Sequence, residues 1–346
     1  AHPFAAMGCV MSTALACMLC NHKCSISRLA ATFAFFPPTP ASYSVEVGED
    51  GECKLSFANE EMEYAVRTMP PTANKVQANV RQLVTKKQET IILFHFTCPG
   101  AEKTLLWSHG NAMDVGEMYF FFLQLADRLK VNIAAYDYSG YGASTGTPTE
   151  ENVYADVLAV HDYLEANGVD IQRQLVLYGQ SIGSTSSLWL ATRRNVLATV
   201  LHTPLLSGLR VLIKPAGCCT LAGCCSPTCV YGLCDPFPNM HRIKRATSPI
   251  LIVHGTHDQT VDCSHSIELY RRCPEAARRE PYIIKGAGHD NIVEFDPETY
   301  FTTISGFLDS LQNGMPGESP SPAAVASQYE SLVGECASSP GDVQGG

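Results

Sequence analysis

Apolar residues follow two patterns along the chain, and the change between them predicts the architecture. From about residue 43 to 98 the apolar runs are short, as at 64–67 and 91–96, and they predict opening antiparallel strands. Beyond residue 104, short apolar runs alternate with longer stretches of helical periodicity. This alternation is typical of an α/β protein with a mostly parallel central sheet and helices on both faces. The predicted strands are 105–108, 132–136, 175–178, 198–202, 249–253 and 282–284, and the predicted helices are 118–129, 150–167 and 184–194.

The same pattern predicts one large domain with an extension at each end. Residues 1–40 form an apolar, cysteine-rich leader, and the domain extends over 41–312. A stretch at about 205–246 has no periodicity, and we interpret it as a short cysteine-rich cap insertion. The segment 313–346 is rich in Gly, Pro, Ser and Ala, which predicts a disordered tail.

The net charge and the cysteine content argue against several classes of protein. The net charge of -10 and the absence of a dense Lys/Arg stripe argue against nucleic acid as a partner. No apolar run in the sequence is long enough to cross a bilayer. The fifteen cysteines are concentrated in two clusters, 9–24 and 218–234. Because the cysteines avoid most of the expected core, they indicate a local role in these two segments rather than a disulfide scaffold for the whole fold.

A Gly-x-Ser-x-Gly sequence, 179–183, stands between a predicted strand and a predicted helix. In this position the motif is typical of the nucleophile elbow of the α/β-hydrolase fold. Its glycines are required because side chains there would collide with the neighbouring strand and helix. The turn lifts Ser181 above the sheet edge, over the positive end of the following helix. The sequence therefore predicts an α/β-hydrolase fold with Ser181 as the nucleophile.

The partners of this serine are predicted from chain order. A serine hydroxyl needs a base, usually a histidine that a carboxylate orients, and in this fold the acid precedes the histidine. Asp258 follows a predicted strand, and His289 stands in a glycine-rich loop after the last one. Asp290 is a rival acid, but its adjacency to His289 points it poorly at the far ring nitrogen. We predict His289 as general base and then acid, with Asp258 as the group that holds the imidazole.

Two backbone N–H groups are predicted to bind the oxyanion of the tetrahedral intermediate. One belongs to Ile182, next to the nucleophile, and the other to Asn111, in the loop after strand 105–108. Losing one such donor typically costs a few kcal/mol of transition-state stabilisation. The mechanism needs no metal and no organic cofactor, and we predict none.

Nine short stretches closely resemble one known family, the α/β-hydrolase-domain-17 group of protein depalmitoylases. They are 108–112, 136–142 with Ser144, 177–183, 202–208, 237–239, 254–256, 264–265, 272–274 and 286–289. The resemblance covers roughly 28–310. It implies a membrane-associated serine hydrolase that cleaves palmitoyl thioesters from cysteines of proteins on the cytoplasmic face. It also carries Ser181, Asp258 and His289 over as the catalytic triad.

The resemblance further implies an S-acylated, cysteine-rich N-terminus that anchors the enzyme. The leader cysteines in that place are Cys9, Cys17, Cys20 and Cys24. On this basis we expect a peripheral, lipid-anchored protein on the cytoplasmic face of the plasma membrane or of endosomal membranes. Its expected partners are that membrane surface and, as substrates, S-palmitoylated membrane proteins.

Residues 7–12 also fit the N-myristoylation pattern, with the acyl chain on Gly8, if Met7 is the true start. One myristoyl chain holds a protein weakly, and a second acyl group makes the attachment stable. The alternative is a signal peptide with 11–19 as its apolar core. The leader lacks a strongly basic start, and its four cysteines lie in and around that stretch.

The second cysteine cluster, 218–234, is longer and richer in cysteine than the family pattern and keeps three interpretations open. It is a further S-acylated or membrane-dipping cap, a zinc site, or a set of oxidised pairs. Its compressed doublets suit zinc poorly. Disulfides require an oxidising compartment, which conflicts with acylation on the cytoplasmic face.

Depalmitoylation is therefore the favoured function, and other functions remain open beside it. A carboxylesterase or a monoacylglycerol-type lipase needs the same triad and an apolar acyl pocket. A serine peptidase is compatible with the fold. From a different class, a catalytically silent membrane scaffold would bind acylated partners.

Overall fold

An eight-stranded sheet forms the centre of the computed structural model, which describes residues 31–32, 34–48, 53–212 and 235–311. The strand order is β10-β9-β8-β7-β5-β6-β4-β3. Strands β5 to β10 run parallel, and β4 runs antiparallel to both β3 and β6. The strands are β3 (Gln77–Val84), β4 (Thr90–Thr97), β5 (Thr104–Ser108), β6 (Asn132–Tyr136), β7 (Leu175–Gln180), β8 (Ala198–His202), β9 (Ile250–Gly255) and β10 (Tyr282–Ile284). This confirms the predicted α/β-hydrolase fold and its mostly parallel sheet.

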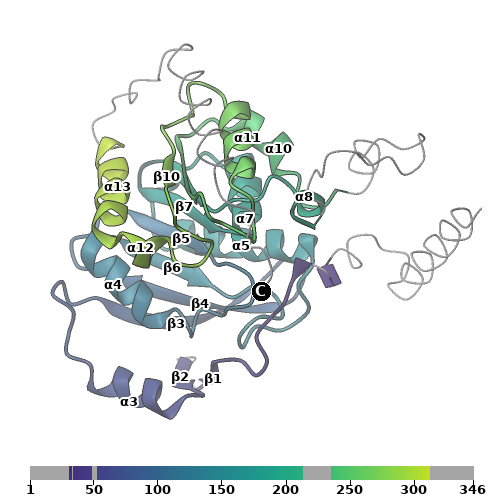
Figure 1. Ribbon diagram of the computed structural model, residues 1–346. Coiled ribbons are helices and arrows are strands. Elements are labelled where there is room, and N and C mark those ends of the chain that lie inside the picture. The colour runs from purple at the N-terminus through teal and green to yellow at the C-terminus, as the bar shows by residue number, and fades with distance from the viewer. Residues whose placement is uncertain (1–30, 33, 49–52, 213–234, 312–346) are drawn as a thin grey trace, which may run out of the picture.

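Helices cover both faces of this sheet, because each central strand is apolar on both sides (Figure 1). In β7, Val176 and Tyr178 pack into one core cluster, whereas Leu175 and Leu177 pack into the other. The first face carries α4 (Tyr119–Leu129), α12 (Ile292–Phe295) and α13 (Pro297–Ser310). The second carries α5 (Glu150–Ala166), α7 (Gly183–Ala191), α10 (Asn239–Arg242) and α11 (Ser264–Arg272). Shorter helices are α6 (Ile171–Gln174), α8 (Gly208–Leu212) and the 3-10 turn η1 (Ile243–Arg245).

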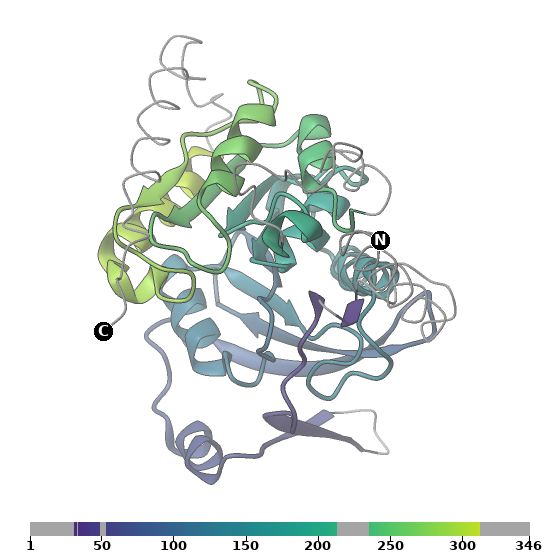
Figure 2. The same ribbon diagram turned by 45° about the vertical axis from the view of Figure 1, so that its right-hand side comes forward.

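A hairpin and a helix lie outside the sheet, beyond its β3 edge (Figure 2). The hairpin pairs β1 (Tyr43–Val47) with β2 (Cys53–Phe57), and α3 (Glu60–Thr68) follows. The predicted strand at 64–67 is therefore wrong, since these residues belong to α3. The Asn59 side chain accepts the N–H groups of Glu61 and Met62 and caps a first turn rich in glutamate, which favours a helix over a strand.

Most of the leader, the whole tail and most of the cap fall outside the described residues. The predicted lipidation sites and the tail 313–346 lie there, as does the cysteine cluster 218–234. The described ends of the cap region contribute α8 on one side and α10 with η1 on the other. None of the helices in the described part of the chain combines the length and hydropathy that crossing a bilayer requires.

Candidate active site

The Gly-x-Ser-x-Gly sequence forms a tight turn between β7 and α7. Ser181 stands at this turn with φ of +52°, a left-handed conformation that a non-glycine residue rarely adopts. Its backbone N–H donates to the carbonyl of His202 on the neighbouring strand, at 2.8 Å. A Cβ atom on Gly183 would lie 2.0 Å from the carbonyl oxygen of Ser108. Glycine is therefore needed here for the close approach of the turn to the end of β5, as the sequence argument required.

The structure brings Ser181, His289 and Asp258 together in one hydrogen-bonded chain. The Nε2 atom of His289 lies 3.0 Å from Ser181 Oγ, and its Nδ1 atom lies 2.6 Å from Asp258 Oδ2. The rival acid, Asp290, is exposed. Of the two carboxylates, the one that orients the imidazole is therefore Asp258.

Two loops that follow β9 and β10 hold the acid and the histidine in this arrangement. The Thr256 N–H donates to the Ile284 carbonyl at 3.0 Å, and the His257 N–H donates to the Ala287 carbonyl at 2.9 Å. A Cβ atom on Gly255 would lie 2.2 Å from the Ala287 oxygen, so the loops pack backbone against backbone. These contacts fix the separation between the two side chains.

Asp258 is buried and accepts hydrogen bonds on both carboxylate oxygens. Its Oδ1 atom accepts from the N–H groups of Thr260 and Val261, at 2.9 and 2.8 Å. Its Oδ2 atom also lies 3.0 Å from Nε2 of His254, which is fully buried. Burial alone would raise the pKa of Asp258, but the bonds from His254 and His289 outweigh it and hold that pKa well below its usual value. The carboxylate therefore stays charged opposite the imidazole.

Sequence reasoning did not assign a role to His254. The signal was present in the sequence, because His254 and Asp258 are four residues apart across a strand end. A single sequence does not show that the chain turns back there and brings the two side chains together.

Two further histidines near the site remain neutral at neutral pH. Burial lowers the pKa of His202 to about 3, and the nearby His289 and His254 add to the effect. Burial likewise lowers the pKa of His265 to about 4. The Nδ1 atom of His202 contacts the Tyr178 hydroxyl at 2.8 Å, and that of His265 accepts from a backbone N–H. These contacts make both rings structural groups rather than rival bases.

The loop after β5, which carries the predicted second oxyanion donor, packs beside the serine turn. A Cβ atom on Gly110 would lie 3.6 Å from the Gln180 side chain. Among the residues that the structure describes, neither the Asn111 N–H nor the Ile182 N–H donates to an acceptor. Both predicted donors are therefore uncommitted in the described structure.

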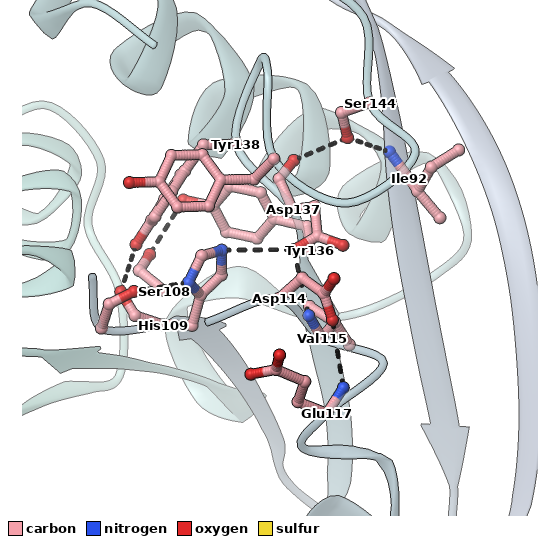
Figure 3. A network of polar contacts seen from close by, with 12 residues as sticks. Ile92, Ser108, His109, Asp114, Val115, Glu117, Tyr136, Asp137, Tyr138 and Ser144 are labelled. Atoms are coloured by element: carbon pink, nitrogen blue, oxygen red, sulfur yellow. Dashed lines mark hydrogen bonds and ion pairs between the residues drawn. The ribbon is translucent and has the colours of Figure 1, made fainter. Parts of the chain in front are cut away.

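A buried polar network supports that loop (Figure 3). The Tyr138 hydroxyl donates to the His109 carbonyl at 2.6 Å. The Nε2 atom of His109 lies 3.4 Å from Asp137 Oδ1, which also accepts the Val115 N–H at 3.0 Å. At the end of β5, the Ser108 and Tyr136 hydroxyls are 2.9 Å apart. The network ties the ends of β5 and β6 together beneath the loop.

Two features outside this site resemble ligand sites. On α5, His161, Asp162 and Glu165 place three potential metal ligands within 4.8 Å of one another. Asp162 already contacts His161 Nδ1 at 3.0 Å and the Lys86 ammonium at 3.6 Å, so two of the three groups are engaged by protein partners. A cavity of about 530 Å³ lies beside Phe35 and the 147–149 loop. It contains none of the predicted site residues.

Comparison with known proteins is consistent with this geometry. Residues 147–296 match the prolyl oligopeptidase family. The human α/β hydrolase domain-containing protein 17B is 37% identical over 280 residues, covering 80% of this chain and 90% of the relative. The Xenopus laevis protein 17C is 36% identical, covering 80% and 88%. The Caenorhabditis elegans α/β hydrolase domain-containing protein aho-3 is 35% identical, covering 85% and 82%.

Solved structures share the fold at low sequence identity. The Pyrococcus furiosus esterase Pf2001 superimposes with a TM-score of 0.54 at 15% identity, covering 80% of this chain and 97% of the esterase. A complex of DcsB with its substrate analogue gives 0.53 at 16%, covering 68% and 99%. At such identities the likeness establishes the fold alone.

Proposed function

Because this chain belongs to the α/β-hydrolase domain-containing protein 17 family, we propose that it removes palmitoyl groups from S-acylated cysteines of membrane proteins. The chain is a hydrolase of the α/β-hydrolase fold. The observation that carries the proposal is the hydrogen-bonded chain from Ser181 through His289 to Asp258. This arrangement can form and release an acyl-enzyme without a cofactor.

In the proposed mechanism, Ser181 Oγ attacks the carbonyl carbon of the thioester while His289 Nε2 takes the hydroxyl proton. The charged Asp258 stabilises the imidazolium that forms. The backbone N–H groups of Ile182 and Asn111 bind the oxyanion of the tetrahedral intermediate. When the intermediate collapses, the C–S bond breaks and His289 donates its proton to the leaving thiolate.

The second half of the cycle regenerates the serine. A water molecule gives a proton to His289 and attacks the acyl-enzyme carbonyl. The second tetrahedral intermediate collapses with proton return from His289 to Ser181 Oγ, and the fatty acid leaves. Each step uses the same two contacts of 2.6 and 3.0 Å that the structure contains.

We propose membrane attachment through acylation of the leader, at Gly8 and at the leader cysteines, Cys9, Cys17, Cys20 and Cys24. Attachment would place the enzyme and the acyl chain of its substrate at one interface and raise their effective concentration. Mass spectrometry of the N-terminal peptides tests this. Palmitate or myristate on these residues supports the anchor, and a fully unmodified leader in membrane-purified protein contradicts it.

We propose the cytoplasmic face of the membrane as the location, as the family resemblance implies. Protease protection of intact vesicles tests this location. Digestion from the cytoplasmic side supports the proposed location, and protection until detergent is added contradicts it.

The activity is tested with a palmitoyl-cysteine peptide and the matched oxygen ester on liposomes, using wild type and Ser181→Ala. We expect thioester turnover that the substitution abolishes, with slower ester cleavage. Preferential ester turnover would favour a carboxylesterase or lipase instead. Absence of both activities, together with absence of Ser181 labelling by a fluorophosphonate, would favour a silent membrane scaffold.

A further inference from the structure

The Asn111 side chain binds a segment near the end of the leader. Its Nδ2 atom donates to the Ala34 carbonyl at 2.7 Å, and its Oδ1 atom accepts the Phe36 N–H at 2.9 Å. The amide thus pairs with a donor and an acceptor two residues apart, as a peptide group does on a neighbouring β-strand. The segment 34–36 is therefore docked through its backbone on one side chain of the site.

Neighbouring aromatic groups reinforce this docking. The Tyr141 hydroxyl donates to Asn111 Oδ1 at 2.7 Å and accepts the Phe36 N–H at 3.1 Å. The Phe35 ring is buried, with edge contacts to Tyr141 and Phe237 at centroid distances of 6.4 and 5.6 Å. The Phe36 ring is 55% exposed. Phe35 thus anchors the segment by its side chain, and Phe36 does so by its backbone.

The same Asn111 side chain sets the shape of its own loop. Its Oδ1 atom also accepts the Ala112 N–H at 3.0 Å, and Ala112 has a left-handed φ of +57°. The backbone N–H of Asn111 is the proposed second oxyanion donor. Asn111 therefore has two roles in one strained loop. Its side chain binds the segment, and its backbone N–H would bind the oxyanion.

We propose that Ala34–Phe36 is a positioning element of the oxyanion site, which deepens the proposed function and rests on it. Docking of the segment holds Asn111 so that its N–H faces the developing oxyanion. Undocking lets the loop relax and weakens transition-state binding more than substrate binding. The end of the leader therefore also supports turnover.

The test uses the full-length protein and two substitutions outside the triad. Tyr141→Phe removes the hydroxyl that bridges Asn111 and the Phe36 N–H but keeps the ring. Phe35→Ala removes the buried anchor. The matched control is Tyr64→Ala, which removes an exposed ring on α3, outside the segment.

Turnover of a palmitoyl-cysteine peptide is measured in detergent micelles, where membrane attachment does not limit the rate. We expect Tyr141→Phe and Phe35→Ala to lower kcat about tenfold, a fraction of the loss on removing a whole oxyanion donor, with KM nearly unchanged. Both should weaken binding of a palmitoyl trifluoromethyl ketone, which forms a tetrahedral oxyanion adduct, by a similar factor. Tyr64→Ala should match wild type in all three quantities.

The outcomes separate this inference from the proposed function. If wild type shows neither Ser181-dependent turnover nor Ser181 labelling, the proposed function fails and the inference with it. If wild type is active and folded Tyr141→Phe keeps full kcat and ketone affinity, the positioning role alone is overturned. Should Phe35→Ala unfold, Tyr141→Phe decides, because it removes a single oxygen atom. A rise in KM with unchanged kcat also overturns it.

Discussion

His254 Nε2 lies 3.0 Å from Asp258 Oδ2, the same carboxylate oxygen that His289 contacts. The Nε2 atom of His254 also lies 2.9 Å from the Val261 carbonyl, so the ring proton must be on this nitrogen. The Nδ1 atom of His254 lies 2.6 Å from the Ser266 hydroxyl oxygen. The imidazoles of His254 and His289 therefore share Asp258 Oδ2 as their acceptor. Because the buried His254 ring donates to this oxygen, its negative charge stabilises the His289 ring less.

From this relationship we predict that His254→Leu shifts the pH dependence of activity. With one donor fewer, Asp258 Oδ2 holds the imidazolium of His289 more strongly. The acid limb of the kcat/KM profile should then move to higher pH. His202 and His265 add no titration of their own in this range, because both have pKa values near 3 to 4.

His254→Gln serves as the matched variant for this measurement, since its amide can still donate an N–H. Its acid limb should lie between those of wild type and His254→Leu. An unmoved acid limb in a destabilised His254→Leu protein would mean that His254 has a packing role only.

The close approach of the serine turn to β5 predicts a severe effect for Gly183→Ala. The added Cβ would lie 2.0 Å from the Ser108 carbonyl oxygen and 2.7 Å from that of His109, so backbone must move. We expect destabilisation by at least about 3 kcal/mol and loss of fluorophosphonate labelling at Ser181. Urea denaturation and labelling kinetics measure the two effects.

Gly306→Ala is the control for that substitution. Gly306 is an exposed residue within α13, and a Cβ there meets nothing within 4 Å. Alanine should stabilise the helix by about 0.5–1 kcal/mol and leave labelling unchanged. Equal unfolding free energies for the two alanine variants would contradict the steric argument.

The sequence was sufficient to predict features that are encoded locally. The strands of the parallel sheet are short buried apolar runs, and Ser181 stands in a motif whose glycines are required by the turn itself. Chain order then identified Asp258 and His289, which the fold brings together. The run 64–67 was misread because four residues with three apolar members fit either a strand or a helix. The Asn59 side chain caps the first turn and so favours the helix.

Contacts between distant segments could not be predicted from a single sequence. The pairing of Asn111 with Ala34 and Phe36 spans more than seventy residues and depends on the path of the chain over the domain. The bond between His254 and Asp258 depends on the turn after β9. Such contacts use ordinary polar residues without a repeating pattern, so only the folded arrangement reveals them.

Asp156 predicts a pH-dependent stability that is independent of the active site. Burial raises its pKa to about 7, although the Ser139 N–H and hydroxyl donate to it at 2.8 and 2.7 Å. A raised native pKa means that the native state binds more protons than the unfolded state between about pH 4 and 7. The stabilisation is therefore complete below about pH 4 and is lost as pH rises through 7.

Asp156→Asn resembles the protonated carboxyl and should remove this decline. Between pH 5 and 8 the wild type should lose stability relative to the variant, on the order of a few kcal/mol. Thermal unfolding at several pH values measures the difference. Glu165→Gln, at an exposed position of the same helix, should parallel wild type. A parallel pH dependence of Asp156→Asn and wild type would exclude Asp156 as the titrating group.

Tyr43 connects the outer hairpin to the buried Asp137. Its hydroxyl donates to Asp137 Oδ2, and its ring makes an edge contact with Phe94 at 5.0 Å. Burial raises the pKa of Tyr43, and the charge of Asp137 raises it further, so the phenol remains a donor at all relevant pH values. Within the described residues, the other protein contacts of this carboxylate, from Val115 and His109, are on Oδ1.

Tyr43→Phe should therefore leave Asp137 Oδ2 buried without a donor while the ring packing is kept. Because the lost bond involves a charged acceptor, we expect a loss of about 1.5–3 kcal/mol in the free energy of unfolding, measured with urea. Tyr64→Phe is the matched control, since Tyr64 is 69% exposed and its change should stay within about 0.5 kcal/mol. Equal stabilities of the two variants would mean that the buried bond adds no net stability. The hairpin would then be held to the domain by ring packing alone.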